Sequence, residues 1–129
     1  MLPYTPQIGT MTDTTPGSTP RVPPKTDTAM VAWMKQHGWT AAKARWELEP
    51  ETGFHVWQEI GKSPGTSHAL WVSDSMVRRL SAQQLIEVLD REEMDQEIRI
   101  SVRMRIEERG SEYRISVVSR RSGEWKQEQ

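Results

Sequence analysis

The chain has 129 residues, of which 35% are hydrophobic, and its 17 basic and 18 acidic residues give a net charge of −1 at pH 7. This balance excludes a general attraction to nucleic acid or anionic membranes, so a charged partner has to meet a local patch. The absence of cysteine excludes disulfides, thiolate catalysis and thiolate metal sites. No apolar run approaches the ~20 residues of a membrane span, and the N-terminus lacks a signal-peptide pattern. We therefore expect a cytoplasmic protein with one modest core.

Residues 1–26 are rich in proline, threonine, serine and glycine. This composition is typical of an extended, polyproline-like arm. A disordered leader and an arm held by a partner both fit it. Because an extended arm can cover a large partner surface, its apolar residues are docking candidates. They are Leu2, Tyr4, Ile8 and Val22.

Residues 27–38 predict a short amphipathic helix, which Asp27 or Thr28 can cap and Gly38 can end. A helix this short is marginal alone and must dock on something. The alternatives are its own domain and a partner protein. Docking on a partner would also use large apolar side chains of this region, because tryptophan is enriched at interfaces. The candidates are Met30, Trp33, Met34 and Trp39.

Residues 43–60 predict a hairpin around a five-residue loop at 49–53. This register pairs Leu48 with Phe54 on the core face and leaves Trp57 on the polar face. Residues 69–73 predict a third strand. The helical stretch that follows changes phase, which indicates a break at Ser81. That serine opens a capping-box pattern, so we expect a main helix over about 81–93.

Residues 97–106 alternate apolar and mostly basic side chains, a period that predicts a half-buried strand. A type II′ turn at Gly110-Ser111 would pair Glu107 with Arg114 in the final hairpin. Moving the turn back by one residue would oppose like charges, so the first register is favoured.

These elements predict an α+β fold: a single antiparallel sheet of about five strands, in the order β-β-β-α-α-β-β, with one main helix on one face. The α+β domain spans residues 39–121, and residues 122–129 form a polar tail. The predicted core comprises Trp46, Leu48, Phe54, Val56, Ile60, Leu85, Ile86, Leu89, Ile98, Ile100, Val102, Met104, Ile106, Tyr113, Ile115 and Val117.

The polar face of the predicted sheet carries several arginines interleaved with glutamates. A solvated, salt-bridged face, a protein-binding face and a surface for single-stranded nucleic acid are the alternatives. The nucleic-acid hypothesis rests on basic side chains beside an aromatic ring on which bases could stack. Its candidates are Arg99, Arg103, Arg105, Arg114 and Trp57.

The sequence contains no convincing catalytic or metal-binding pattern. Gly61-Lys62-Ser63 resembles the end of a phosphate-binding loop, but Val56 occupies the position where that motif needs glycine. The three histidines show no ligand spacing, and no cofactor is indicated. We therefore expect a non-enzymatic accessory or structural subunit that docks on a larger protein assembly through its arm and first helix. A nucleic-acid-binding module is the alternative, and a small-ligand-binding domain is a weaker one. The sequence does not indicate the oligomeric state.

Overall fold

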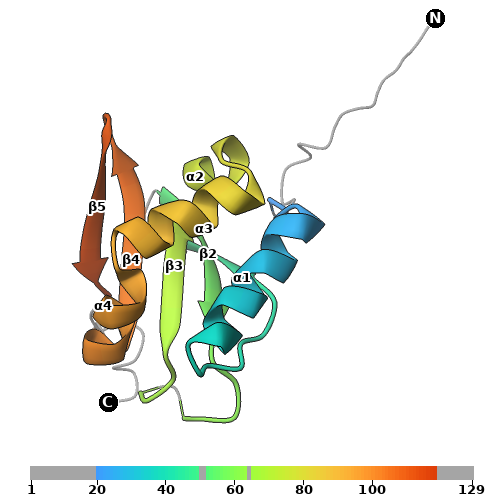
Figure 1. The fold of residues 1–129 in the computed structure, drawn as a ribbon, viewed down its shortest axis with the longest axis vertical. Helices are drawn as coiled ribbons and strands as arrows, with labels where there is room; N and C mark the ends of the chain where they lie inside the picture. The colour runs from blue at the N-terminus through green and yellow to red at the C-terminus, as the bar shows by residue number, and fades with distance from the viewer. Residues whose placement is uncertain (1–19, 50–51, 64, 119–129) are drawn as a thin grey trace, which may run out of the picture.

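The computed structural model describes residues 20–49, 52–63 and 65–118. In these residues a mixed sheet of five strands carries several helices (Figure 1). The element order is α1 (Pro24–Gln36), β1 (Arg45–Glu49), β2 (Thr52–Gln58), β3 (Ala69–Ser73), α2 (Asp74–Arg79), α3 (Ala82–Arg91), α4 (Met94–Ser101), β4 (Arg103–Arg109) and β5 (Glu112–Val117).

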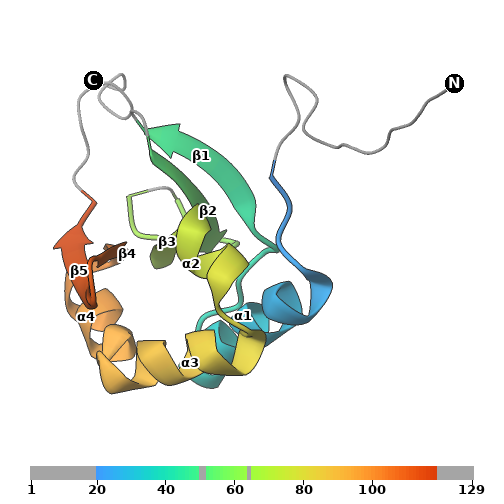
Figure 2. The same ribbon diagram turned by 90° about the horizontal axis from the view of Figure 1, so that it is seen from above.

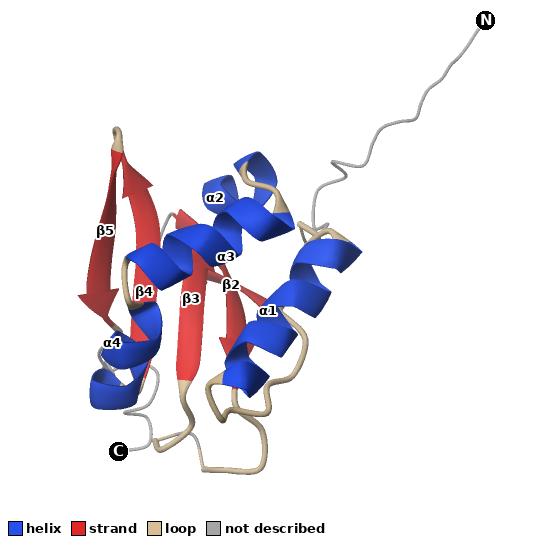
Figure 3. Ribbon diagram, viewed as in Figure 1, coloured by secondary structure: helices blue, strands red, loops and turns tan. Residues whose placement is uncertain are grey.

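The strands lie in the spatial order β1-β2-β3-β4-β5, and every neighbouring pair is antiparallel except β3 and β4, which run parallel. The α+β class is confirmed, but the predicted purely antiparallel sheet is wrong. Parallel neighbours need a crossover connection, and α2, α3 and α4 provide it between β3 and β4. Figures 1, 2 and 3 show the helices on one face of the sheet. Several helices therefore form the layer that we predicted to be one main helix.

Two local predictions are confirmed at the helical break and in the final hairpin. The Ser81 hydroxyl accepts a hydrogen bond from the Gln84 backbone N–H, and the Gln84 side chain accepts one from the Ser81 N–H, which completes the capping box of α3. In the final hairpin Glu107 pairs with Arg114, and Gly110 has a positive φ of 63°. Cross-strand charge pairing therefore identified the correct register.

The predicted strand over residues 97–106 is wrong in its first half, because α4 extends through Ser101. Ile98 is fully buried, whereas Ile100 is 80% exposed. Residues two apart differ by about 200° around a helix, so they lie on opposite sides. Alternation over so few residues does not distinguish this geometry from a strand.

The register of the first hairpin also differs from the prediction. Glu49 pairs with Thr52 and Leu48 with Gly53, a shift of one position from the predicted Leu48–Phe54 pair. Such a shift moves every side chain of one strand to the opposite face. Phe54 therefore lies away from the helices, and Trp57 lies beneath them.

Gly53 provides a physical reason for this register. A Cβ at this position would lie 1.8 Å from a carbon of the Trp46 ring. The indole therefore lies across the space that a larger residue would occupy. An aromatic ring that covers a glycine in the neighbouring strand is a recognised way of stabilising a sheet.

The principal core lies between the sheet and the helices, and it includes more of the chain than we predicted. α1 packs against α3, and its buried residues join those of the sheet. The core residues that the prediction omitted are Met30, Trp33, Met34, Trp39, Ala41, Trp57, Leu70, Val72, Met76, Val77, Val88 and Met94. Four predicted core residues are instead exposed, namely Leu48, Ile60, Ile100 and Val117.

α1 begins at Pro24, earlier than predicted, with Pro23 as its N-cap and no side-chain cap. Proline suits the first turn of a helix, where its missing N–H would have had no partner. The expected cap by Asp27 or Thr28 is therefore wrong. The Asp27 carboxylate instead accepts a hydrogen bond from Trp57 Nε1 at 2.8 Å and another from the Ala44 N–H at 3.2 Å.

Candidate functional site

The docking residues predicted on the first helix lie inside the domain. Met30, Trp33, Met34 and Trp39 are all between 0 and 4% exposed. Of the two alternatives for this helix, the structure therefore has it docked on its own domain. The half-buried Val22 packs against the same core. Leu2, Tyr4 and Ile8 lie outside the described residues.

The residues predicted for nucleic-acid binding do not form one surface. Arg103, Arg105 and Arg114 share the sheet face that lies away from the helices, as the strand pairing requires. Arg99 is on α4, with its guanidinium 5.3 Å from the centre of the Trp39 ring. Trp57 is fully buried on the opposite face. The predicted stacking ring is therefore separated from the arginines.

The helix-free face has its own aromatic residues, and charged side chains lie over them. The Arg105 guanidinium lies 5.4 Å from the centre of the Phe54 ring. The Arg45 guanidinium lies 5.9 Å from that of Trp71. Trp71 Nε1 donates a hydrogen bond to Glu47 at 2.9 Å, and Glu47 is also 3.1 Å from Arg45. Because both rings are almost fully buried, neither offers a free surface on which a base could stack.

Two carboxylate–histidine pairs stand out electrostatically, and the first joins β2 to α2. Asp74 Oδ1 lies 2.7 Å from Nε2 of the buried His55, and Arg78 Nε donates to Asp74 Oδ2 at 2.7 Å. Burial acts to raise the pKa of Asp74, but the hydrogen bonds from His55 and Arg78 outweigh it. The pKa of this carboxyl therefore lies below its ordinary value.

The second pair holds the connection between β2 and β3. The buried Glu59 Oε1 lies 2.8 Å from His68 Nδ1 and accepts the His68 backbone N–H at 3.1 Å. Lys62 Nζ lies 3.4 Å from Glu59 Oε2. Burial raises the pKa of Glu59, but these hydrogen bonds lower it further than burial raises it. Trp39 stacks on the His68 ring with a centroid separation of 5.0 Å.

Neither pair is completed as a catalytic site within the described residues. In a hydrolytic triad a carboxylate orients a histidine, which in turn contacts a nucleophile. Among the described residues, no serine or threonine hydroxyl bonds to the imidazole of His55 or His68. The same residues contain no group of three or more side chains that could hold a metal ion. In this structure the two pairs connect secondary-structure elements.

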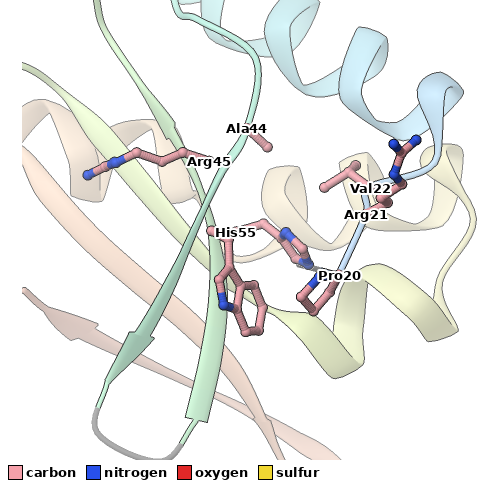
Figure 4. Close-up of a pocket in the computed structure, with 7 residues that line it drawn as sticks. Pro20, Arg21, Val22, Ala44, Arg45 and His55 are labelled. Atoms are coloured by element: carbon pink, nitrogen blue, oxygen red, sulfur yellow. The ribbon is translucent and has the colours of Figure 1, made fainter. Parts of the chain in front are cut away.

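Two pockets formed by described residues are small. The pocket in Figure 4 has a volume of about 220 Å³ and lies between residues 20–22 and the first hairpin, with the His55 imidazole directed toward Pro20. A second pocket of about 290 Å³ lies beside Arg79 and the tip of the final hairpin. Sites for drug-sized ligands usually range from ~300 to 1,000 Å³. These two pockets therefore give little support to the small-ligand hypothesis.

Strand β5 forms one edge of the sheet. The Val118 N–H donates a hydrogen bond to the Arg103 carbonyl at 3.0 Å. Because backbone direction alternates along a strand, the N–H and C=O groups of Tyr113, Ile115 and Val117 point away from β4. No described residue pairs with this outer side of β5. Such an edge is a template for another strand.

Exposed apolar side chains lie at the end of the sheet where β4 begins. Val117 is 52% exposed and pairs with Met104 on β4. Ile100 is 80% exposed and lies in the last turn of α4. Figure 3 shows β5 at the edge of the sheet, next to β4. We call the outer side of β5, with its exposed Val117, the β5 edge. The sequence pattern had assigned its apolar residues to the core, so it gave no signal for this surface.

Comparisons with known proteins give no match from which a function could be transferred. No protein-family model, curated protein or solved structure matches the chain. Within the described residues, no helix is long and apolar enough to cross a membrane.

Proposed function

We propose that this protein is a non-enzymatic accessory subunit, and that its interaction surface is the β5 edge. The observation that carries the proposal is the coincidence of two features on one strand. The outward backbone groups of Tyr113, Ile115 and Val117 have no described partner, and the apolar side chain of Val117 on the same strand is exposed. An added strand would gain backbone hydrogen bonds and apolar contact together.

The proposal changes the surface that was predicted from the sequence. The apolar side of α1 is used inside the domain, and its exposed residues include Lys25, Thr28, Lys35 and Gln36. These polar side chains favour water over a partner. Docking through α1 would therefore require the core to open, whereas docking at β5 requires no rearrangement.

The test compares two exposed apolar residues on opposite edges of the sheet. Val117→Lys places a charge on β5, and Leu48→Lys places the same charge on β1, where Leu48 is 62% exposed. Each tagged full-length variant is used to isolate partners from the native source. We expect Val117→Lys to lose a partner that the wild type and Leu48→Lys retain. Equal retention, or equal loss with both variants, would contradict the proposal.

Nucleic-acid binding remains a second candidate because Arg45, Arg103, Arg105 and Arg114 share one sheet face. Glu47 and Glu107 on the same face reduce its positive potential. If this face bound single strands, the affinity would fall steeply with salt, and Arg114→Ala would reduce the dependence. A titration of labelled oligonucleotide at low salt tests the idea, and no measurable binding would exclude it.

A further inference from the structure

We propose that the occupant of the β5 edge is the β5 strand of a second copy of this chain, in an antiparallel arrangement with a two-fold axis at Ile115. This inference rests on the proposed function and names the partner at the same surface. Two five-stranded sheets would then join into one continuous sheet. A two-fold interface uses the same patch on both subunits, so the patch must be complementary to itself.

The directions of the backbone groups satisfy the first requirement of self-pairing. The groups that point outward belong to Tyr113, Ile115 and Val117, which alternate along the strand. In an antiparallel pair, two residues that exchange both hydrogen bonds lie directly opposite each other. With the axis at Ile115, this residue faces its own copy, and Tyr113 faces Val117 of the other chain. Each outward N–H then donates to an outward C=O of the other chain, and each outward C=O accepts from an outward N–H.

Charge and side-chain matching distinguish this register from those with the axis at Arg114 or at Tyr113. An axis at Arg114 would place two like charges directly opposite each other, which is destabilising. An axis at Tyr113 would pair Glu112 with Arg114 favourably, but the overlap would run into the turn at Gly110 and leave Val117 exposed. The axis at Ile115 uses the whole strand, covers Val117 and places Arg114 opposite Ser116. We therefore favour this register.

The two faces of the sheet also match across such an interface. Tyr113, Ile115 and Val117 share the face of Met104 and Ile106, which is covered by the helices. Glu112, Arg114 and Ser116 share the helix-free face. A two-fold axis perpendicular to the sheet preserves these sides, so apolar residues meet apolar residues and polar residues meet polar ones. Exposed Val117 then gains contact with the half-buried Tyr113.

The first measurement is the mass of the full-length chain in solution across a concentration series by sedimentation equilibrium. We expect the wild type to approach twice its monomer mass of 14.9 kDa. Val117→Pro removes an outward N–H without removing the Val118–Arg103 hydrogen bond, so we expect a folded monomer. Leu48→Lys is the control on the other edge and should remain dimeric. A wild type that is monomeric throughout overturns the inference.

The second measurement reads the register directly, because the chain contains no cysteine. Ile115→Cys places two thiols opposite each other across the axis, at the ~5.5 Å Cα separation of a hydrogen-bonded pair, which a disulfide can bridge. We expect mild oxidation to cross-link Ile115→Cys but not Tyr113→Cys or Arg114→Cys. Preferential cross-linking at Tyr113 or Arg114 would refute the proposed axis.

These experiments separate the inference from the proposed function. If the wild type is monomeric and Val117→Lys still loses a native partner that Leu48→Lys retains, self-pairing fails and strand addition by another protein stands. If Val117→Lys and Leu48→Lys behave alike in partner isolation, the proposed function fails.

Discussion

Asp27 connects three elements of the fold through one oxygen atom, so its removal should weaken the whole domain. Oδ1 accepts hydrogen bonds from Trp57 Nε1 on β2 and from the Ala44 N–H just before β1, while Asp27 itself lies in the first turn of α1. Asp27→Ala would leave the Trp57 indole N–H without its acceptor. Trp57 is 0% exposed, so water has little access to replace the carboxylate.

The magnitude follows from the two donors and from the position of the charge. A hydrogen bond to a charged group contributes about 1.5–3 kcal/mol, and an unsatisfied buried donor costs about 1–3 kcal/mol. Ala44 is half-exposed, so its N–H can turn to water at little cost. An acidic residue in the first helical turn adds about 0.3–1 kcal/mol. We expect Asp27→Ala to lower the free energy of unfolding by about 3 kcal/mol.

Urea denaturation followed by circular dichroism measures this loss, with thermal unfolding as a second readout. A loss of about 3 kcal/mol corresponds to a fall in Tm of more than about 10 °C for a domain of this size. Asp27→Asn retains an oxygen for both donors and should cost only about 1 kcal/mol. Asp90→Ala is the comparison variant for a carboxylate that water can reach. Asp90 also accepts a hydrogen bond from a tryptophan, Trp33 Nε1, at 3.0 Å, but it is itself exposed.

A double-mutant cycle with Trp57→Phe identifies the interaction itself. If the Asp27–Trp57 bond carries the effect, the double variant should lose about 1–2 kcal/mol less than the sum of the single losses. Additive losses would contradict this assignment. A loss below about 1 kcal/mol for Asp27→Ala, or equal losses for the alanine and asparagine variants, would refute the reasoning as a whole.

Three further predictions concern strain, pH and packing. Val102 has a φ of 73°, which a β-branched residue tolerates poorly. Urea denaturation should therefore show Val102→Gly to be at least as stable as Val102→Ala. A glycine variant with a free energy of unfolding about 1 kcal/mol below that of the alanine variant would contradict this. The lowered pKa of Asp74 stabilises the fold above the ordinary value of about 3.9, and this contribution is lost as pH falls through the folded pKa. Acid titration of Asp74→Asn should therefore show a shallower stability loss below about pH 4, and an unchanged profile would rule the contribution out. Gly53→Ala should lower the free energy of unfolding by about 1–3 kcal/mol, and with it Tm, because the added Cβ meets the Trp46 ring. Trp46→Leu should recover part of this loss, and no recovery would argue against the clash.

The two hairpins show what the sequence could determine. In the final hairpin, the charges of Glu107 and Arg114 separate two registers that differ by one residue, and the favoured register is the observed one. In the first hairpin, the decisive contact is the Trp46 ring over Gly53. That contact depends on three-dimensional fit, which apolar alternation does not encode. A one-residue error in the loop then assigned Phe54 and Trp57 to the wrong faces.

Long-range contacts explain why the candidate surfaces also had to be revised. The helical spacing of α1 correctly predicts an apolar side, but only the packing of α1 against α3 reveals what covers it. The parallel pairing of β3 with β4 likewise depends on the crossover through α2, α3 and α4. Neither feature leaves a local pattern in the sequence. Trp33 and Trp39, which we predicted to face a partner, lie in the core instead.

The errors around the start of β4 have a common physical cause. The alternation from Ile98 to Ile106 satisfies a strand, yet the chain remains helical through Ser101 and turns at the strained Val102 before β4 begins. Ile100, which precedes this turn, is exposed, and so is Val117 at the end of β5. Natural sequences depart from local consistency mainly at functional or strained sites. The features of this region that the sequence pattern did not predict therefore favour the β5 edge as the interaction surface.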